Sequence, residues 1–188
     1  SVQLPSIDDV IQLPPGSQRT RAVRKIQIYW AILKKAGFQA DEQRMRGLNL
    51  TGATPHGPSH FDPHFKKVLL EAVYGKPPNF SAPKTLDELR VHLEQGENFR
   101  QQAGNNTALQ ISSGPVFDAD DEALLGFLNP AIGGGPRMLR PYMVYHDPHA
   151  GDFVQQILES LDNGQTVILD LGNATDEIRR YFSDLLSR

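Results

Sequence analysis

An aspartate at the end of an apolar run is the residue in this sequence best placed for catalytic chemistry. Asp170 follows the run 167–169, which is Val-Ile-Leu. In nucleotide-hydrolysing enzymes, an aspartate at the carboxyl end of a buried strand holds Mg²⁺, and a following Glu positions the attacking water. Here Leu171 stands in place of that Glu. Asp170 is therefore either a weak candidate for a nucleotide site or a structural residue that ties down the turn at Gly172-Asn173.

The sequence contains no phosphate-binding loop. The pattern G-x-x-x-x-G-K-[ST] does not occur, since Gly75-Lys76 is followed by Pro77 and the run Gly133–Gly135 has no lysine after it. A G-x-S-x-G nucleophile motif is also missing. We therefore expect that this chain alone neither binds ATP well nor hydrolyses it, and that it holds no cofactor of its own.

Four basic residues lie on or near one side of a helix expected over residues 17–36. They are Arg21, Arg24, Lys25 and Lys35. One interpretation is an ordinary solvated helix face. The other is a surface that contacts the phosphates of DNA, because cations in a row release counterions from a nucleic acid backbone.

Histidines and aspartates cluster at residues 56–64, with the spacing H-x3-H-x-D-x-H, and again at residues 146–152. This spacing would suit a metal ion, but Asp62-Pro63 is also a typical helix start, with Asp as the cap and Pro at the first helical position. We therefore predict that neither cluster binds a metal.

Helical patterns dominate the first two thirds of the chain. Ser17 can cap the first helix and Gly37 can end it, and the helix carries an apolar face on which Ile26, Tyr29 and Leu33 are expected to be buried. Further helices are predicted from Asp62 to Gly75, from Thr85 to Gly96 and from Asp118 to Asn129, with loops at 37–60 and 129–136.

The C-terminal part shows an α/β pattern. A helix from Phe153 is followed by the turn Asn163-Gly164, a strand over 165–171 and a helix that begins near Thr175. Residues 142–145 are the other local strand candidate. We thus predict a helical region at 1–136 and an α/β unit at 137–188, in a chain that is mainly α. Because a lone strand cannot satisfy its backbone, the chain is expected to be an incomplete piece of a larger α/β protein.

Composition sets wider bounds. The chain has 188 residues, a net charge of −3, 14 prolines and no cysteine, so disulfides and thiolate zinc sites are excluded. No apolar run approaches the roughly 20 residues that a membrane helix needs. The absence of cysteine suits a cytoplasmic protein. The start at Ser1, without Met, suggests a boundary inside a longer protein.

The segment from Ile157 to Gly172, followed by Asp176–Arg180, resembles a stretch of HerA-type ATPases, which are hexameric DNA-translocating motors related to FtsK. In that family a helix, a short turn and an apolar strand ending in Asp-Leu-Ser lie between the phosphate loop and the strand that holds magnesium. The resemblance implies a piece of a P-loop ATPase that uses ATP and Mg²⁺. Gly172 replaces the usual Ser, and Asp170 matches by position only, so the family's ATP-site residues are not carried over.

A second interpretation is that the chain is not part of an enzyme. The chain could be a mainly helical adaptor, a protein- or nucleic-acid-binding module whose short strand docks on the sheet of a partner. The coding sequence on either side of this chain would separate the two interpretations.

Overall fold

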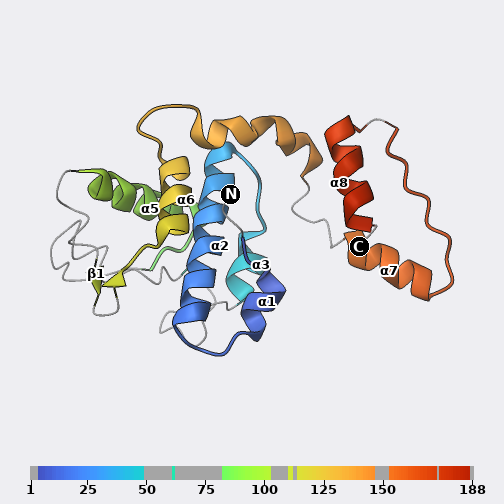
Figure 1. Cartoon of the computed structure of the whole chain (residues 1–188), viewed down its shortest axis with the longest axis horizontal. Helices are drawn as coiled ribbons and strands as arrows, with labels where there is room; N and C mark the ends of the chain where they lie inside the picture. The colour runs from blue at the N-terminus through green and yellow to red at the C-terminus, as the bar shows by residue number, and fades with distance from the viewer. Residues whose placement is uncertain are drawn as a thin grey trace. The chain divides into compact units, whose positions relative to one another are not determined.

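The structure is a computed structural model that describes residues 4–48, 61, 82–102, 110–111, 114–146, 153–172 and 174–186. The chain is mainly α, as the sequence predicts (Figure 1). It divides into two compact units, residues 1–148 and 149–188, so the boundary lies twelve residues beyond the predicted one at 136. The predicted helix at 62–75 lies outside the described residues.

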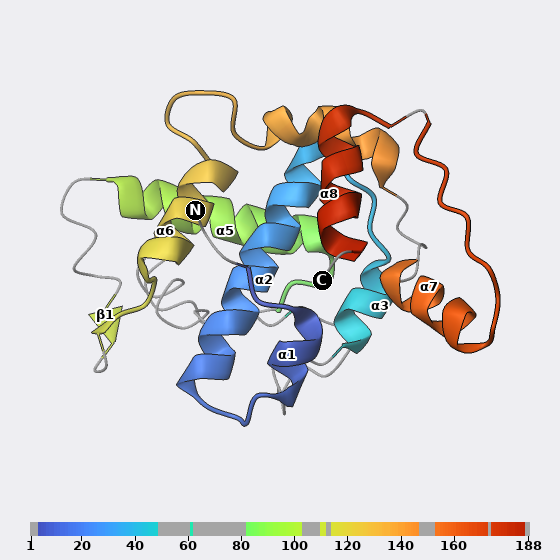
Figure 2. The same cartoon turned by 45° about the vertical axis from the view of Figure 1, so that its right-hand side comes forward.

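Helix α2, Ser17–Ala36, is the element around which the first unit is built. It ends as predicted, because Gly37 has a left-handed φ of 109° and its N–H donates to the carbonyl of Leu33. Its start differs from the prediction: Gly16 occupies the cap position, and Ser17 is already the first helical residue. The helix lies between the pair α5–α6 on one side and α1 on the other (Figure 1 and Figure 2).

Helices α5, Leu86–Gln101, and α6, Ala119–Leu128, begin at side-chain caps that the sequence predicts. The hydroxyl of Thr85 accepts a hydrogen bond from the N–H of Glu88, and the carboxylate of Asp118 accepts one from the N–H of Asp121. Helix α5 does not stop at Gly96 as predicted. Gly96 is buried inside the helix, which continues to Gln101.

The core of the first unit forms where α2, α5 and α6 meet. Ile28 and Ile32 of α2 are fully enclosed there, together with Leu89, Leu93 and Leu125. The predicted apolar face of α2 is therefore partly wrong: Ile26 is buried, but Tyr29 and Leu33 are only half-buried. The physical reason is that α5 and α6 pack on the side of α2 that carries Ile28 and Ile32, whereas Leu33 lines an open hollow beside α3.

Two short helices and a pair of short strands also belong to this unit. Helix α1, Ile7–Gln12, buries Val10 against α2. Helix α3, Glu42–Gly47, begins at Asp41, whose carboxylate caps the N–H of Arg44, in a region predicted to be a loop. Strands β1, Gln110–Ile111, and β2, Gly114–Pro115, form one antiparallel pair.

The 3₁₀ helix η2, Gly135–Tyr145, lies across the C-terminal end of α2 (Figure 1). The strand predicted at 142–145 is therefore wrong. Pro136 and Pro141 each remove a backbone donor, which disfavours strand pairing here, and the side chain of Leu139 packs on the core instead.

The second unit contains helix α7, Phe153–Asp162, and helix α8, Asp176–Leu186. The Asn163-Gly164 turn ends α7 as predicted, with Gly164 at φ 73°, and α8 begins next to Thr175. Residues 165–171 form neither strand nor helix in the structure and run as an open segment between the two helices (Figure 1). The predicted strand is thus wrong for this chain on its own, because the described residues supply no neighbouring strand for it.

Candidate functional site

Arg24, one of the four predicted DNA-contacting residues, is buried inside the first unit. Its Nε donates to Oδ2 of Asp121 on α6 at 2.8 Å, and its guanidinium lies 5.6 Å from the ring centre of Phe117. Arg24 is 5% exposed and Asp121 is fully buried. This ion pair clamps α2 to α6, so Arg24 is not available to a nucleic acid.

Lys25 and Lys35 are also engaged in ion pairs. Nζ of Lys25 lies 2.5 Å from Oδ2 of Asp118, and Nζ of Lys35 lies 2.8 Å from Oε1 of Glu94 on α5. Arg21 is the exposed member of the predicted set, and it lines a hollow that is also lined by Asp9 and Asp120. Three of the four residues predicted to form a basic surface are therefore engaged in ion pairs between helices.

The two aspartates at the start of α6 have opposite pKa shifts. Burial raises the pKa of Asp118, but hydrogen bonds from Lys25 and from the N–H of Asp121, with the nearby cations, outweigh it, so its pKa lies below the ordinary value. At Asp121 burial dominates over the attraction of Arg24 and raises the pKa above the ordinary value. The free-energy cost of desolvating Asp121 therefore offsets part of what its ion pair with Arg24 contributes to the α2–α6 contact.

Asp170 takes the structural position that the sequence left open as an alternative. Its Oδ1 accepts a hydrogen bond at 2.8 Å from the N–H of Gly172, two residues on. This local bond holds the turn that follows the 165–171 segment. The carboxylate is exposed, and among the described residues no basic side chain is bonded to it.

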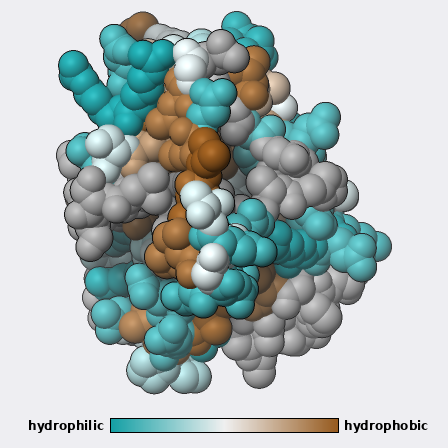
Figure 3. Space-filling view, turned by 90° about the vertical axis from the view of Figure 1, so that its right-hand side faces the viewer, coloured by the Kyte–Doolittle hydropathy of each residue, from teal (hydrophilic) through white to brown (hydrophobic). Residues whose placement is uncertain are grey.

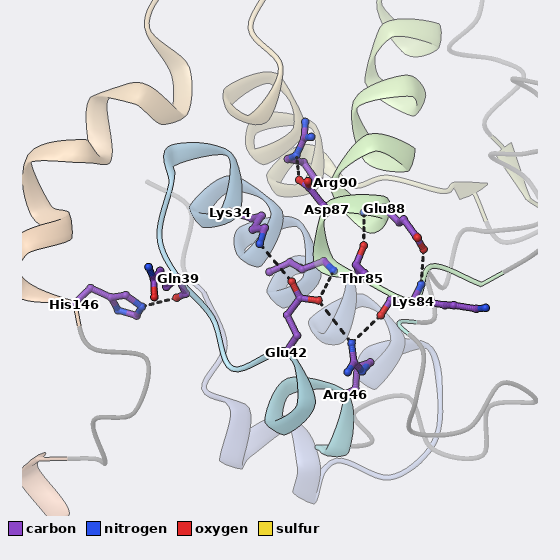
Figure 4. A network of polar contacts seen from close by, with 11 residues as sticks. Lys34, Gln39, Glu42, Arg46, Lys84, Thr85, Asp87, Glu88, Arg90 and His146 are labelled. Carbon is purple, nitrogen blue, oxygen red and sulfur yellow. Dashed lines mark hydrogen bonds and ion pairs between the residues drawn. The ribbon is translucent and has the colours of Figure 1, made fainter.

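A network of polar contacts joins α2, α3 and the start of α5, centred on Glu42 (Figure 4). The Glu42 carboxylate accepts from the N–H of Leu86 at 3.0 Å and lies near Lys34 and Arg46. Arg46 in turn donates to the carbonyl of Lys84 at 2.7 Å. These contacts fix α3 to the first turn of α5.

Next to this network lies a hollow of about 380 Å³. Trp30, Phe38 and Met45 supply apolar walls, while Asp41 and Arg44 lie at its polar side. A half-enclosed apolar hollow is the usual form of a small-ligand site. However, its acids and bases are balanced, and nothing in its lining selects one ligand chemistry.

The histidine clusters do not form a metal site among the residues that the structure describes. His146, the described member, uses its ring otherwise: Nε2 is 2.8 Å from the carbonyl oxygen of Gln39 (Figure 4). The ring also packs edge-on against Phe38. The cluster at 56–64 and residues 147–152 lie outside the described part of the chain.

Sequence reasoning missed the exposed side of η2. Arg137, Met138, Tyr142 and Val144 are all exposed there, and no periodic pattern singles them out. The signal that could have found them is charge: residues 129–146 contain two arginines and no acidic residue.

No family model, no curated protein and no solved structure matches this chain. No helix in the described part of the chain is long and apolar enough to cross a membrane.

Proposed function

We propose that this chain is a part of a HerA-like, ATP-driven DNA translocase, namely a helical insertion followed by one core strand of the ATPase sheet. On its own it has no ATPase activity, because the loop and lysine that hold the phosphates are not in its sequence. ATP, Mg²⁺ and a hexameric assembly belong to the longer protein.

The observation that carries this proposal is the state of residues 165–171. Their β-branched, apolar sequence favours a strand, yet Ile168 is 88% exposed and Leu169 is 41% exposed. Burial of one such side chain stabilises a protein by about 1.5–3 kcal/mol. Neighbouring strands from the same longer protein would recover that free energy.

The helices on either side support the same reading. Helix α7 exposes Leu158 and Leu161, in a part of the molecule where an α/β protein would cover such a face with its sheet. In the space-filling view, a band of hydrophobic side chains is open to the viewer between hydrophilic ones (Figure 3). Apolar surface of this kind marks a face that another part of a protein covers.

A helical adaptor is the second candidate function, and the same exposed segment favours it. A free strand-forming segment can add to the edge of a partner's sheet. The two candidates differ in where the missing strands come from: the same polypeptide or another one.

The experiment that tests the proposal reads the coding sequence on both sides of this chain and assays the protein that the whole reading frame encodes. We expect a G-x-x-x-x-G-K-[ST] loop upstream, an apolar strand ending in Asp-Glu downstream, and ATP hydrolysis that is lost when the loop lysine is changed to Ala. A complete reading frame with neither motif would leave the adaptor as the better account.

A further inference from the structure

The exposed arginines of the first unit differ in their surroundings. Among the described residues 1–148, Arg21, Arg44, Arg137 and Arg140 are exposed. Arg21 shares a hollow with Asp9 and Asp120, and Arg44 shares one with Asp8 and Asp41. These two arginines therefore have carboxylate side chains among the residues that line the same hollow.

Among the residues that the structure describes, no ion pair joins Arg137 or Arg140 to a carboxylate. They lie three residues apart in η2, where a 3₁₀ helix places residues i and i+3 on the same side. Residues 129–146 include no Asp or Glu. Arg140 spends one donor, Nε, on the carbonyl of Ala36 at 3.3 Å, which leaves its two terminal nitrogens for another ligand. This is a site of uncompensated positive charge in a chain of net charge −3.

Apolar and aromatic side chains are open beside these charges. Tyr142 is 52% exposed, Met138 is 65% exposed and Val144 is 81% exposed. Residues 138, 141 and 144 share one side of η2, because the repeat is three residues per turn. Leu139 packs on the core and Met143 lies against Gly37, and these two contacts anchor η2 while Met138, Tyr142 and Val144 stay exposed.

We infer that the exposed residues of η2 bind single-stranded nucleic acid, with Arg137 and Arg140 on the phosphates and Tyr142 stacked on a base. Sites for single strands combine cations that follow the backbone with aromatic faces on which the bases stack. The lack of acidic residues favours a polyanion, and a duplex would keep its bases away from Tyr142. This inference rests on the proposed DNA-processing function, and it places the nucleic-acid contact on η2 where the sequence suggested α2.

A titration of the whole chain with a labelled oligothymidylate of about 15 nucleotides tests the site by fluorescence anisotropy. The double variant R137A/R140A should bind about tenfold more weakly, and its plot of log affinity against log salt should be flatter by about 1.4, since each phosphate contact on a single strand contributes about 0.7. Y142A should lose at least about fivefold in affinity. A duplex of the same length should bind more weakly than the single strand.

The matched control is R21A/R44A, which removes the same charge from two other exposed arginines and should leave binding and salt slope unchanged. Because Arg140 also bonds to Ala36, R137A alone provides a variant that keeps this hydrogen bond. Equal losses in the two double variants, or none in either, would overturn the site. So would self-association of the chain, seen by sedimentation, that R137A/R140A abolishes while the oligonucleotide does not bind. None of these results depends on the ATPase motifs that test the proposed function.

Discussion

The buried pair Arg24–Asp121 gives the most direct prediction at the scale of single residues. Changing Asp121 to Ala leaves the Arg24 guanidinium buried without its partner, and such a change costs about 3–5 kcal/mol of the free energy of unfolding. Urea denaturation followed by circular dichroism measures it.

The control for that prediction is Asp87, whose side chain is 60% exposed in its pair with Arg90. Asp87→Ala should cost less than about 1 kcal/mol, as exposed ion pairs do. If Asp121→Ala were as mild as Asp87→Ala, the buried pair would not be holding α2 to α6.

His92 on α5 makes stability depend on pH. Burial lowers the pKa of its imidazole below 6.5, and the Glu88 carboxylate opposes this only in part. The unfolded chain therefore binds the proton at a higher pH than the folded chain, so stability should fall as pH drops through 6.5 towards the lower folded pKa. The difference in unfolding free energy between the native chain and His92→Gln should change over this range. A difference that stays constant from about pH 8 to about pH 5, a range that brackets the ordinary pKa of 6.5, would contradict the assignment.

Helix caps were predictable from the sequence because they are local. Thr85 caps an N–H three residues away, and Gly37 supplies the left-handed turn that few other residues adopt. The partner of Arg24 was not predictable, because it lies 97 residues further along the chain. For this reason the sequence suggested that Arg24, Lys25 and Lys35 are open to a ligand, whereas in the fold they form ion pairs.

At the scale of elements, substitutions at two neighbouring residues of α2 test which face of this helix is buried, the one predicted from the sequence or the one in the structure. Ile32→Ala should cost about 2–5 kcal/mol, because the side chain is enclosed in the core and its removal leaves a cavity. Leu33→Ala should cost clearly less, because Leu33 lines the open hollow by α3. Urea titrations measure the free energy of unfolding of both variants. If Leu33→Ala lost as much of this free energy as Ile32→Ala, or more, the buried face would be the one predicted from the sequence.

The 165–171 segment shows where sequence reasoning must fail for a strand. Helices α7 and α8 satisfy their own backbones, so their positions followed from apolar spacing, the Asn163-Gly164 turn and Thr175. A strand needs hydrogen bonds from another strand, and the described part of this chain offers none to residues 165–171. The β-branched residues favour a strand, but a strand forms only where a neighbouring strand supplies hydrogen bonds to its backbone.

At the scale of the whole molecule, the chain by itself should not turn over ATP. The reason for this expectation is that its sequence does not contain the G-x-x-x-x-G-K-[ST] loop, whose lysine stabilises the charge that develops during phosphoryl transfer in P-loop enzymes. Phosphate release, measured against a buffer blank and in protein free of contaminating ATPases, should equal the blank. Turnover above it would contradict the proposed role as a part of a larger motor.

The central claim is that residues 165–171 become a strand only within a sheet that other parts of a longer protein supply. Hydrogen exchange read by mass spectrometry tests this claim, on the isolated chain and on the protein encoded by the whole reading frame. We predict that the backbone amides of 166–171 exchange rapidly in the isolated chain and are strongly protected in the longer protein, while α2 is protected in both. Protection of 166–171 in the isolated chain, or rapid exchange in both proteins, would contradict the account.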